Sequence, residues 1–328
     1  MKKKVIVFST GGTILSSAAN PTELTNYTNR GTKISDILSL NGDADVEYRE
    51  LYSIPSSQVG LPHWKTMISE TEKVLSKDDV AGAVITHGTD TLEESAFLMN
   101  LIVKSDKPIV FTGAMRPNGA LGSDGELNLN NSIKAAMSPL SQNRGVLVCF
   151  NGKIGDARLI TKTHTLDPST FQAPEYGFCG FIINDYIEFL SRCDKPHTKS
   201  SEFELNDLNR LDSLSYVPVI TSYPEETSDF IDAALMRGAK GIVYAGMGHG
   251  NVTPAAEKAL SECRKRGVIV VRASRTGGPV LPSKEKWMQM GFIPSGSLSA
   301  NKARLLLALS IAKHGQSQSE AERIFRTY

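Results

Sequence analysis

The chain has 328 residues, a length typical of about two domains. Its 36 Lys and Arg residues nearly balance its 35 Asp and Glu residues, and the net charge of +1 gives no electrostatic case for binding nucleic acid or an anionic membrane. With 40% hydrophobic and 22% charged residues, the composition is that of an ordinary globular protein, and no apolar run reaches the length of a membrane span. The four cysteines lack zinc-ligand spacing and are expected to be free thiols.

A short apolar strand is predicted over residues 5–8, and it runs into the turn Ser9-Thr10-Gly11-Gly12-Thr13-Ile14. Paired glycines after a strand allow a tight turn and a close approach of the backbone to a ligand. The turn lacks both the three-glycine spacing of a dinucleotide site and the Gly-Lys-Ser/Thr of a phosphate loop. Residues 16–32, which follow, are polar, with Tyr27 as their only aromatic residue. They are predicted to form a mobile lid over a site.

The most informative stretch comes after a predicted strand over residues 46–52, a loop over 54–58 and a helix over 63–75. Ala83-Val84-Ile85 is apolar, like a strand buried on both faces, and the polar run Thr86-His87-Gly88-Thr89-Asp90-Thr91 follows at once. Thr91 and Glu94 have the spacing of a capping box, which predicts a helix over 92–103. Because ligands bind beyond the carboxyl ends of strands in open α/β sheets, this run is predicted to form a site.

The rest of the chain continues the alternation of strands and helices. Further strands are predicted over residues 108–111, 145–150, 181–189, 217–222, 241–245 and 268–272, and further helices over 228–236, 254–266, 301–312 and 319–325. This alternation favours right-handed βαβ units and parallel sheets, the α/β class. Residues 191–213 are polar and lack apolar periodicity, so we expect an N-terminal catalytic domain over 1–190, a linker over 191–213 and a C-terminal domain over 214–328.

The two polar turns resemble the signatures of a known family. Thr10-Gly11-Gly12-Thr13-Ile14 and His87-Gly88-Thr89-Asp90-Thr91 are similar to those of the bacterial-type L-asparaginases and glutaminase-asparaginases, and the likeness extends over nearly the whole chain. The resemblance implies a larger N-terminal α/β domain with a mainly parallel sheet flanked by helices and a smaller C-terminal α/β domain. It implies hydrolysis of the side-chain amide of L-asparagine, with L-glutamine as a second substrate, and neither a metal nor an organic cofactor. It also implies a homotetramer built from two dimers.

The family's functional residues can be carried over by position. The resemblance implies a catalytic group of Thr13, Tyr27, Thr89, Asp90 and Lys162, with Thr13 as the nucleophile and Tyr27 on the lid. It implies substrate contacts from Gly12, Ser57, Gln58, Gly88, Thr89, Asp90 and Ala114, with the Ala114 carbonyl facing the leaving amide. Asn251 is expected to reach the site of a neighbouring subunit. An acidic residue of the neighbour is also expected there, and the spacing puts Lys284 or Glu285 at that position, of which Glu285 carries the acid.

These residue types can activate a threonine nucleophile and stabilise an oxyanion. A threonine hydroxyl is a weak nucleophile at neutral pH and needs a base. Lys162 could act as that base if its pKa were lowered, or it could stay charged beside Asp90 and polarise Thr89; the sequence leaves both roles open. Backbone N–H groups of the Gly11-Gly12 and Gly88-Thr89 segments could stabilise an oxyanion. A serine or cysteine triad with His87 is set aside because no Gly-x-Ser-x-Gly elbow is present.

Two other functions compete with hydrolysis of a free amino acid. The amidase subunit of a tRNA-dependent amidotransferase would carry an extra N-terminal domain, whereas the first strand here starts at Val5. A non-catalytic amino-acid-binding protein on the same fold would be expected to lack a nucleophile or Lys162. The four apolar residues 5–8 are too few for a signal-peptide core, so a cytoplasmic location is expected, or a periplasmic one if a signal peptide was removed.

Overall fold

The computed structural model describes residues 3–25, 27–28, 45–213, 216–282 and 285–328, and the chain folds into two compact units, Met1–Leu205 and Asn206–Tyr328. The division falls inside the segment expected to be a linker. That segment carries a 3-10 turn, η4 (Thr198–Ser200), and a short helix, α5 (Leu205–Asn209). Phe203 and Leu208 within it are fully buried, so apolar packing holds this polar stretch in place.

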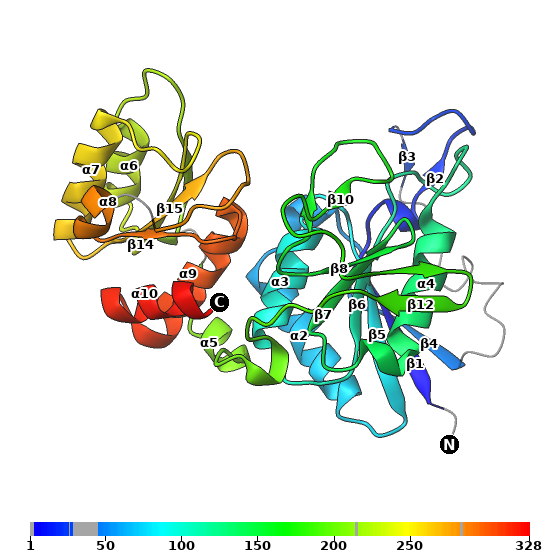
Figure 1. The fold of residues 1–328 in the computed structure, drawn as a ribbon. Coiled ribbons are helices and arrows are strands. Elements are labelled where there is room, and N and C mark those ends of the chain that lie inside the picture. The colour runs from blue at the N-terminus through cyan, green and yellow to red at the C-terminus, as the bar shows by residue number, and fades with distance from the viewer. Residues whose placement is uncertain (1–2, 26, 29–44, 214–215, 283–284) are drawn as a thin grey trace. The chain divides into compact units, whose positions relative to one another are not determined.

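The first unit is built on an eight-stranded sheet (Figure 1). In spatial order its strands are β12 (Tyr186–Phe189), β11 (Gly180–Ile183), β8 (Lys153–Asp156), β7 (Val146–Phe150), β6 (Ile109–Thr112), β5 (Val80–Thr86), β1 (Lys4–Ser9) and β4 (Asp45–Glu50). The strands from β7 to β4 pair in parallel, and β8, β11 and β12 extend the sheet with antiparallel pairs. This confirms the predicted α/β class with a mainly parallel sheet.

Helices cover both faces of this sheet. Side chains alternate between the faces of a strand. One set, including Val5, Val84 and Val110, packs against Leu129 and Ile133 of α4 (Gly125–Met137). The helices α2 (Leu61–Leu75) and α3 (Leu92–Ile102) contact β5, β6 and β7. The central strands are therefore buried on both faces, which explains why their sequences are continuous apolar runs.

Three predictions for this unit were wrong in detail. Helix α4 was not predicted at all, and the strand expected over 181–189 is a hairpin of β11 and β12 that turns at Asn184, whose φ is 55°. The capping box is absent because Thr91 precedes α3 without a side-chain cap, and its hydroxyl instead donates to the carbonyl of Ser56 at 2.8 Å. A side chain used for a long-range contact cannot also cap its own helix.

Part of the segment expected to be a lid lies among the described residues. A 3-10 turn, η1 (Thr13–Leu15), directly precedes it, and within it β2 (Ser17–Ala18) pairs antiparallel with β3 (Tyr27–Thr28). Ile14, Leu15 and Ser16 are buried, so the start of the segment belongs to the core and not to a free loop. Residue 26 and residues 29–44, which include the end of the expected lid, lie outside the described residues.

The second unit contains a four-stranded parallel sheet. Its strands, in order, are β13 (Val219–Thr221), β14 (Gly241–Gly246), β15 (Ile269–Ser274) and β16 (Phe292–Pro294). Ile242 and Tyr244 share a core with α6 (Asp229–Met236) and α7 (Pro254–Lys265), and a Cβ on Gly241 would meet Leu307 of α9 (Ala300–His314). The remaining helices are α8 (Glu285–Gln289) and α10 (Gln318–Thr327). The predicted smaller α/β domain is confirmed.

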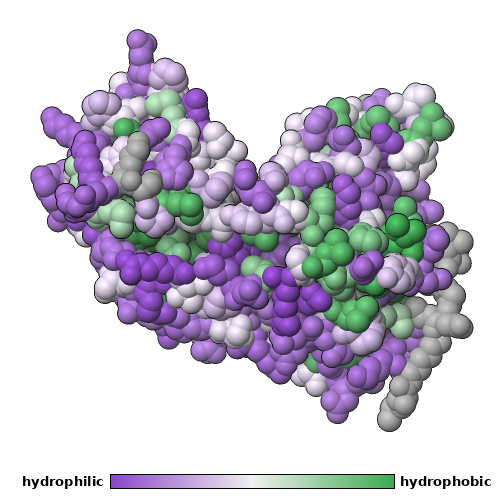
Figure 2. All heavy atoms as spheres, in the orientation of Figure 1, coloured by the Kyte–Doolittle hydropathy of each residue, from purple (hydrophilic) through white to green (hydrophobic). Residues whose placement is uncertain are grey.

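The first unit also has several short elements and a number of exposed apolar side chains. The short elements include η2 (Ser56–Gln58), η3 (Pro139–Ser141), and the paired strands β9 (Thr161–Lys162) and β10 (Phe171–Gln172). In Figure 2 apolar side chains gather over the part of this unit where β8, β10 and β12 lie in Figure 1. Exposed apolar side chains on β11, β12 and α4 include Ile183, Tyr186 and Leu127. None of the helices among the described residues is long and apolar enough to cross a membrane.

Candidate active site

The two polar turns meet at the carboxyl ends of β1 and β5. These strands are parallel neighbours, with Ser9 opposite Thr86. From β1 the chain passes to β4 on one side of β1, and from β4 it crosses back to β5 on the other side. This reversal of strand order is where open α/β sheets bind ligands. The Thr10 hydroxyl donates to the carbonyl of Thr86 at 2.9 Å, so it ties the two strand ends together.

Glycine is required where the turns touch. Gly12 has a φ of 90°, which side chains rarely allow, and a Cβ on it would lie 2.6 Å from the Cα of Gly88. The backbones before Thr13 and Thr89 are therefore in direct contact, closer than any other residue would permit. The sequence predicted a close approach of this backbone to a ligand, and the structure shows instead a close approach between two parts of the chain.

A cavity of about 230 Å³ opens at this junction. It is lined by Gly12, Thr13, Leu24, Thr25, Pro55, Ser56, Gly88, Thr89, Asp90, Met115, Lys162, Thr165 and Leu166. Six residues named from the sequence are thus brought together from separate segments of the chain: Gly12, Thr13, Gly88, Thr89, Asp90 and Lys162. Its size suits a small polar molecule.

Lys162 connects the elements of the cavity. Its ammonium group donates to the Thr89 hydroxyl at 2.9 Å and to the Asp90 carboxylate at 2.7 Å. The Lys162 side chain is 17% exposed and that of Asp90 is 68% exposed, so the ion pair faces the open side of the cavity. The backbone N–H of Lys162 donates to the buried Glu93 at 3.2 Å, which fixes the short strand β9 beside α3. The arrangement holds a cation against a threonine hydroxyl.

The serine that lines the cavity is Ser56, which the sequence did not single out. Ser57 and Gln58, which were expected to bind substrate, are exposed on η2 and do not line the cavity, whereas Ser56 is buried. A Cβ on Gly88 would lie 2.7 Å from the Ser56 hydroxyl, so these two residues are in contact. The run Pro-Ser-Ser-Gln predicts a turn but cannot tell which serine faces inward.

The loop after β6 forms another wall. Ala114 is 1% exposed, and its neighbour Met115 lines the cavity. The Asp124 carboxylate accepts the backbone N–H groups of Met115 and Arg116 at 2.9–3.1 Å, and Asn128 donates to the carbonyl of Gly113 at 3.1 Å. Burial raises the pKa of Asp124 despite these N–H donors. The unpredicted helix α4 therefore holds this wall.

Two further segments contribute residues that were not predicted. Leu24 and Thr25 come from the segment before Tyr27, whose own side chain lies outside the described residues. Thr165 and Leu166 come from the turn between β9 and β10, where the His164 ring accepts the backbone N–H groups of Leu166 and Asp167. His164 stands directly before Thr165, and a single histidine ahead of a loop is a weak signal, so sequence reasoning could not have found this wall.

Asn251 and Glu285 belong to the second unit. Asn251 closes a tight turn in which its N–H donates to the carbonyl of Met247 at 2.7 Å. The Arg272 guanidinium, 1% exposed, donates to the carbonyls of His249 and Gly250 and stacks on Trp287 at 4.6 Å. The turn is therefore rigidly held. Glu285 is the exposed first residue of α8, and Lys284 lies outside the described residues.

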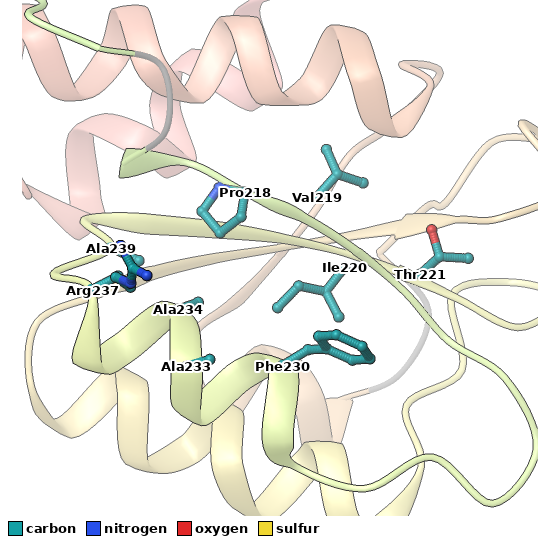
Figure 3. A pocket seen from close by; sticks show the side chains of 9 residues that line it. All are labelled: Pro218, Val219, Ile220, Thr221, Phe230, Ala233, Ala234, Arg237 and Ala239. Carbon is teal, nitrogen blue, oxygen red and sulfur yellow. The ribbon is translucent and has the colours of Figure 1, made fainter.

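A larger cavity, of about 620 Å³, lies in the second unit between β13 and α6 (Figure 3). Its lining is mainly apolar, including Ile220 and Phe230, and Arg237 is the only charged side chain among its lining residues. Among its lining residues, Thr221 carries the single hydroxyl and none carries a carboxylate, so the lining does not offer the groups that hydrolytic chemistry needs. Among the residues with described positions, no three His, Cys, Asp or Glu side chains gather as metal ligands.

Comparison with known proteins gives a consistent result over both units. A family model for the N-terminal domain of asparaginase matches residues 4–195, and one for the C-terminal domain of glutaminase/asparaginase matches residues 216–325. L-asparaginase 2 of Bacillus subtilis is 38% identical over 95% of this chain and 83% of its own, and glutaminase-asparaginase of Pseudomonas fluorescens is 32% identical over 99% and 90%.

A solved structure resembles the whole chain. The crystal structure of a probable cytoplasmic L-asparaginase from Campylobacter jejuni is 32% identical, covers 100% of both chains and superposes with a TM-score of 0.93.

Proposed function

The chain belongs to the asparaginase family of amidohydrolases, and we propose from this premise that it hydrolyses the side-chain amide of L-asparagine to L-aspartate and ammonia, with Thr13 as the nucleophile. The observation that carries the proposal is the contact of Lys162 with both Thr89 and Asp90 in a cavity that Thr13 also lines. A lysine from a separate hairpin, aimed at one of two threonines, is an arrangement suited to activating hydroxyl groups.

The hydrogen bonds favour one role for Lys162. Its ammonium group, which is paired with the Asp90 carboxylate, can only donate hydrogen bonds. The Thr89 hydroxyl therefore accepts from Lys162 and can donate its own proton to the substrate. In this proposal the Thr13 hydroxyl oxygen attacks the amide carbon, and its proton passes by way of Tyr27 to the amide nitrogen. The C–N bond then breaks, so that ammonia leaves and the aspartyl group remains as an ester on Thr13. A water in the cavity attacks this ester, returns one proton to Thr13 and releases L-aspartate. Tyr27 of the lid assists the attack by Thr13.

The ends of the substrate are proposed to bind the same cavity. The exposed Asp90 carboxylate pairs with the α-ammonium, and the η2 turn that carries Ser56, Ser57 and Gln58 binds the α-carboxylate. The Ala114 carbonyl accepts the amide N–H groups. Because several relatives are named glutaminase-asparaginases, L-glutamine is proposed as a second substrate.

We further propose a homotetramer, a dimer of dimers, in which Asn251 and Glu285 complete the site of a neighbouring subunit. The rigid turn that holds Asn251 and the exposed apolar side chains on β11 and β12 support an assembly. We propose a cytoplasmic location, as in the name of the Campylobacter jejuni protein; a periplasmic relative, from Haemophilus influenzae, has the competing location.

The test is ammonia release by the purified protein from L-asparagine, L-glutamine and acetamide, assayed side by side. We expect ammonia and L-aspartate in equal amounts from asparagine, a slower reaction with glutamine, and none with acetamide, which lacks the α-groups. Absence of ammonia from both amino acids, in protein that is folded by circular dichroism, would overturn the proposed activity. Release from acetamide at the same rate would overturn the proposed binding of the α-groups.

A further inference from the structure

A buried chain of hydrogen bonds ends at the backbone next to Thr89. The Trp64 indole of α2 donates to the Ser95 hydroxyl of α3 at 2.8 Å, and this hydroxyl lies 3.0 Å from Nε2 of His87. On the other side of the ring, Nδ1 lies 2.8 Å from the carbonyl oxygen of Gly88. Trp64, His87 and Ser95 are all buried, so water does not compete for these contacts.

The partners determine where the protons are. A backbone carbonyl can only accept, so Nδ1 of His87 must carry the hydrogen that is shared with Gly88. The indole N–H can only donate, so the Ser95 hydroxyl accepts from Trp64 and is free to donate its own proton to Nε2. This pattern needs a neutral ring. Burial lowers the pKa of His87 to about 4, which agrees with a ring that stays neutral near pH 7.

The orientation of the Gly88 carbonyl matters for the site. The C=O and N–H of one peptide plane point in opposite directions, so fixing the Gly88 oxygen also fixes the Thr89 N–H. Within the part of the chain that the structure describes, the Thr89 N–H donates to no protein group. The Gly88 Cα, at which this peptide begins, packs against Gly12, next to the proposed nucleophile. A free, rigidly aimed N–H beside a nucleophile can stabilise a developing oxyanion.

We propose that His87 is a positioning residue, held as the Nδ1–H tautomer by Trp64 and Ser95, that fixes the peptide of Gly88 and Thr89 for catalysis. The ring does not line the cavity, and it acts only through the backbone. For its kinetic readout this inference rests on the proposed amidohydrolase activity. It gives a reason for a histidine at this position that differs from both a triad member and simple core packing against Phe111.

Two amide variants separate the two sides of the ring. His87→Asn places an N–H near the position of Nδ1, so it keeps a donor for the Gly88 carbonyl and loses the contact with Ser95. His87→Gln reaches the position of Nε2, so it keeps a partner for Ser95 and leaves the Gly88 carbonyl without its donor. We expect His87→Gln to lower kcat about 100-fold with little change in KM, because a misplaced catalytic group costs about that much. We expect His87→Asn to keep roughly tenfold more activity than His87→Gln, because its donor preserves most of the positioning.

If His87 has only a packing role, the two variants should rank differently in stability and activity. If His87 only fills space, the shorter Asn leaves the larger void, and His87→Asn should be the less stable and no more active of the two. Equal kcat values, or a higher kcat for His87→Gln, would overturn the proposal. Melting temperatures measured alongside show whether a loss of activity is a loss of folded protein.

A spectroscopic measurement on the wild-type protein tests the tautomer directly. It needs no substrate, and it does not depend on whether a variant folds. Nitrogen chemical shifts of His87 in the 15N-labelled wild-type protein at pH 7 should show a protonated Nδ1 and an unprotonated Nε2. Assignment comes from loss of the signals in His87→Asn or, if that variant does not fold, from couplings to the sequential backbone. An Nε2–H or doubly protonated ring would overturn the proposal even if the enzyme hydrolyses asparagine. A correct tautomer in an inactive protein would support the tautomer and remove only the proposed activity.

Discussion

The contacts of Lys162 in the fold distinguish it from an ordinary surface lysine. In the sequence it lies more than 70 positions from Thr89 and resembles any surface lysine, so only the family resemblance drew attention to it. In the structure it is a mostly buried ammonium group within hydrogen-bonding distance of both Thr89 and Asp90. Because the Asp90 carboxylate is 68% exposed, water can solvate it if the partner is lost. The ion pair is therefore expected to contribute little to stability.

Lys162→Met should separate these two contributions. Methionine has a similar length and suits a mostly buried stem, so we expect the melting temperature to change little. We expect kcat for asparagine to fall by at least about 100-fold with a modest change in KM, the pattern of a lost transition-state interaction. Lys199→Met, which breaks an exposed ion pair with Asp106, is the matched control and should keep its kcat. Near-normal turnover in folded Lys162→Met would take Lys162 out of the chemistry.

At the scale of elements, sequence patterns predicted the strands whose side chains are buried on both faces of the sheet. Continuous apolar runs predicted β1, β5, β6 and β7 to within a few residues, because strands covered on both faces must be apolar. Helix α4 could not be found in this way. Three of its residues are asparagines, which form helices poorly in isolation, and it is stabilised by tertiary contacts such as those of Asn128 with Gly113 and Asn151.

The same limit applies to the candidate site. The two glycine-containing turns were found because glycine and hydroxyl residues directly after a buried strand are typical of a turn that faces a ligand. Ser56, Thr165 and Leu166 were missed because their places depend on how loops fold over the strand ends. The capping role of Thr91 was wrong for a related reason. A hydroxyl can serve its own helix or a distant carbonyl, and only the three-dimensional fold decides between the two.

Gly12→Ala tests the contact between the two turns. A Cβ would lie 2.6 Å from the Gly88 Cα at a φ of 90°, so we expect the free energy of unfolding to fall by at least about 2 kcal/mol. We also expect a loss of activity beyond what the unfolded fraction explains, because Gly12 precedes Thr13. Gly278→Ala is the control, since its Cβ would meet only Thr276 Oγ1, at 3.4 Å. Equal denaturation midpoints for the two variants would show that the close approach is not required.

At the scale of the whole molecule, the central expectation is that subunits share sites. Thr89 lies in the first unit and Asn251 in the second, and the proposal assigns them to the same site from different chains. The exposed apolar side chains Ile183 and Tyr186 are consistent with a surface that another subunit covers. The comparisons establish the family of the chain, and its assembly is a separate question that an experiment on mixed subunits can answer.

Mixing two impaired variants gives that experiment. Thr89→Val and Asn251→Ala should each form oligomers of low activity. If sites are shared, a mixed oligomer contains some sites that carry both substitutions and some that carry neither, so activity should reappear after co-refolding. Each variant refolded alone is the control. If the mixture has only the mean activity of its two components, or light scattering shows a fully active monomer, the shared site is wrong.

The most direct test of the account is the ammonia released from L-asparagine by Thr13→Ala, Thr89→Val and the double variant, under identical conditions. The two threonines are proposed to act as one catalytic unit, so each single substitution should lower kcat by at least about 1,000-fold, with the fold intact. The double variant should then be little slower than either single variant, because the loss of one member already disables the unit. A folded single variant with near-wild-type turnover, or losses that multiply in the double variant, would contradict the proposed chemistry.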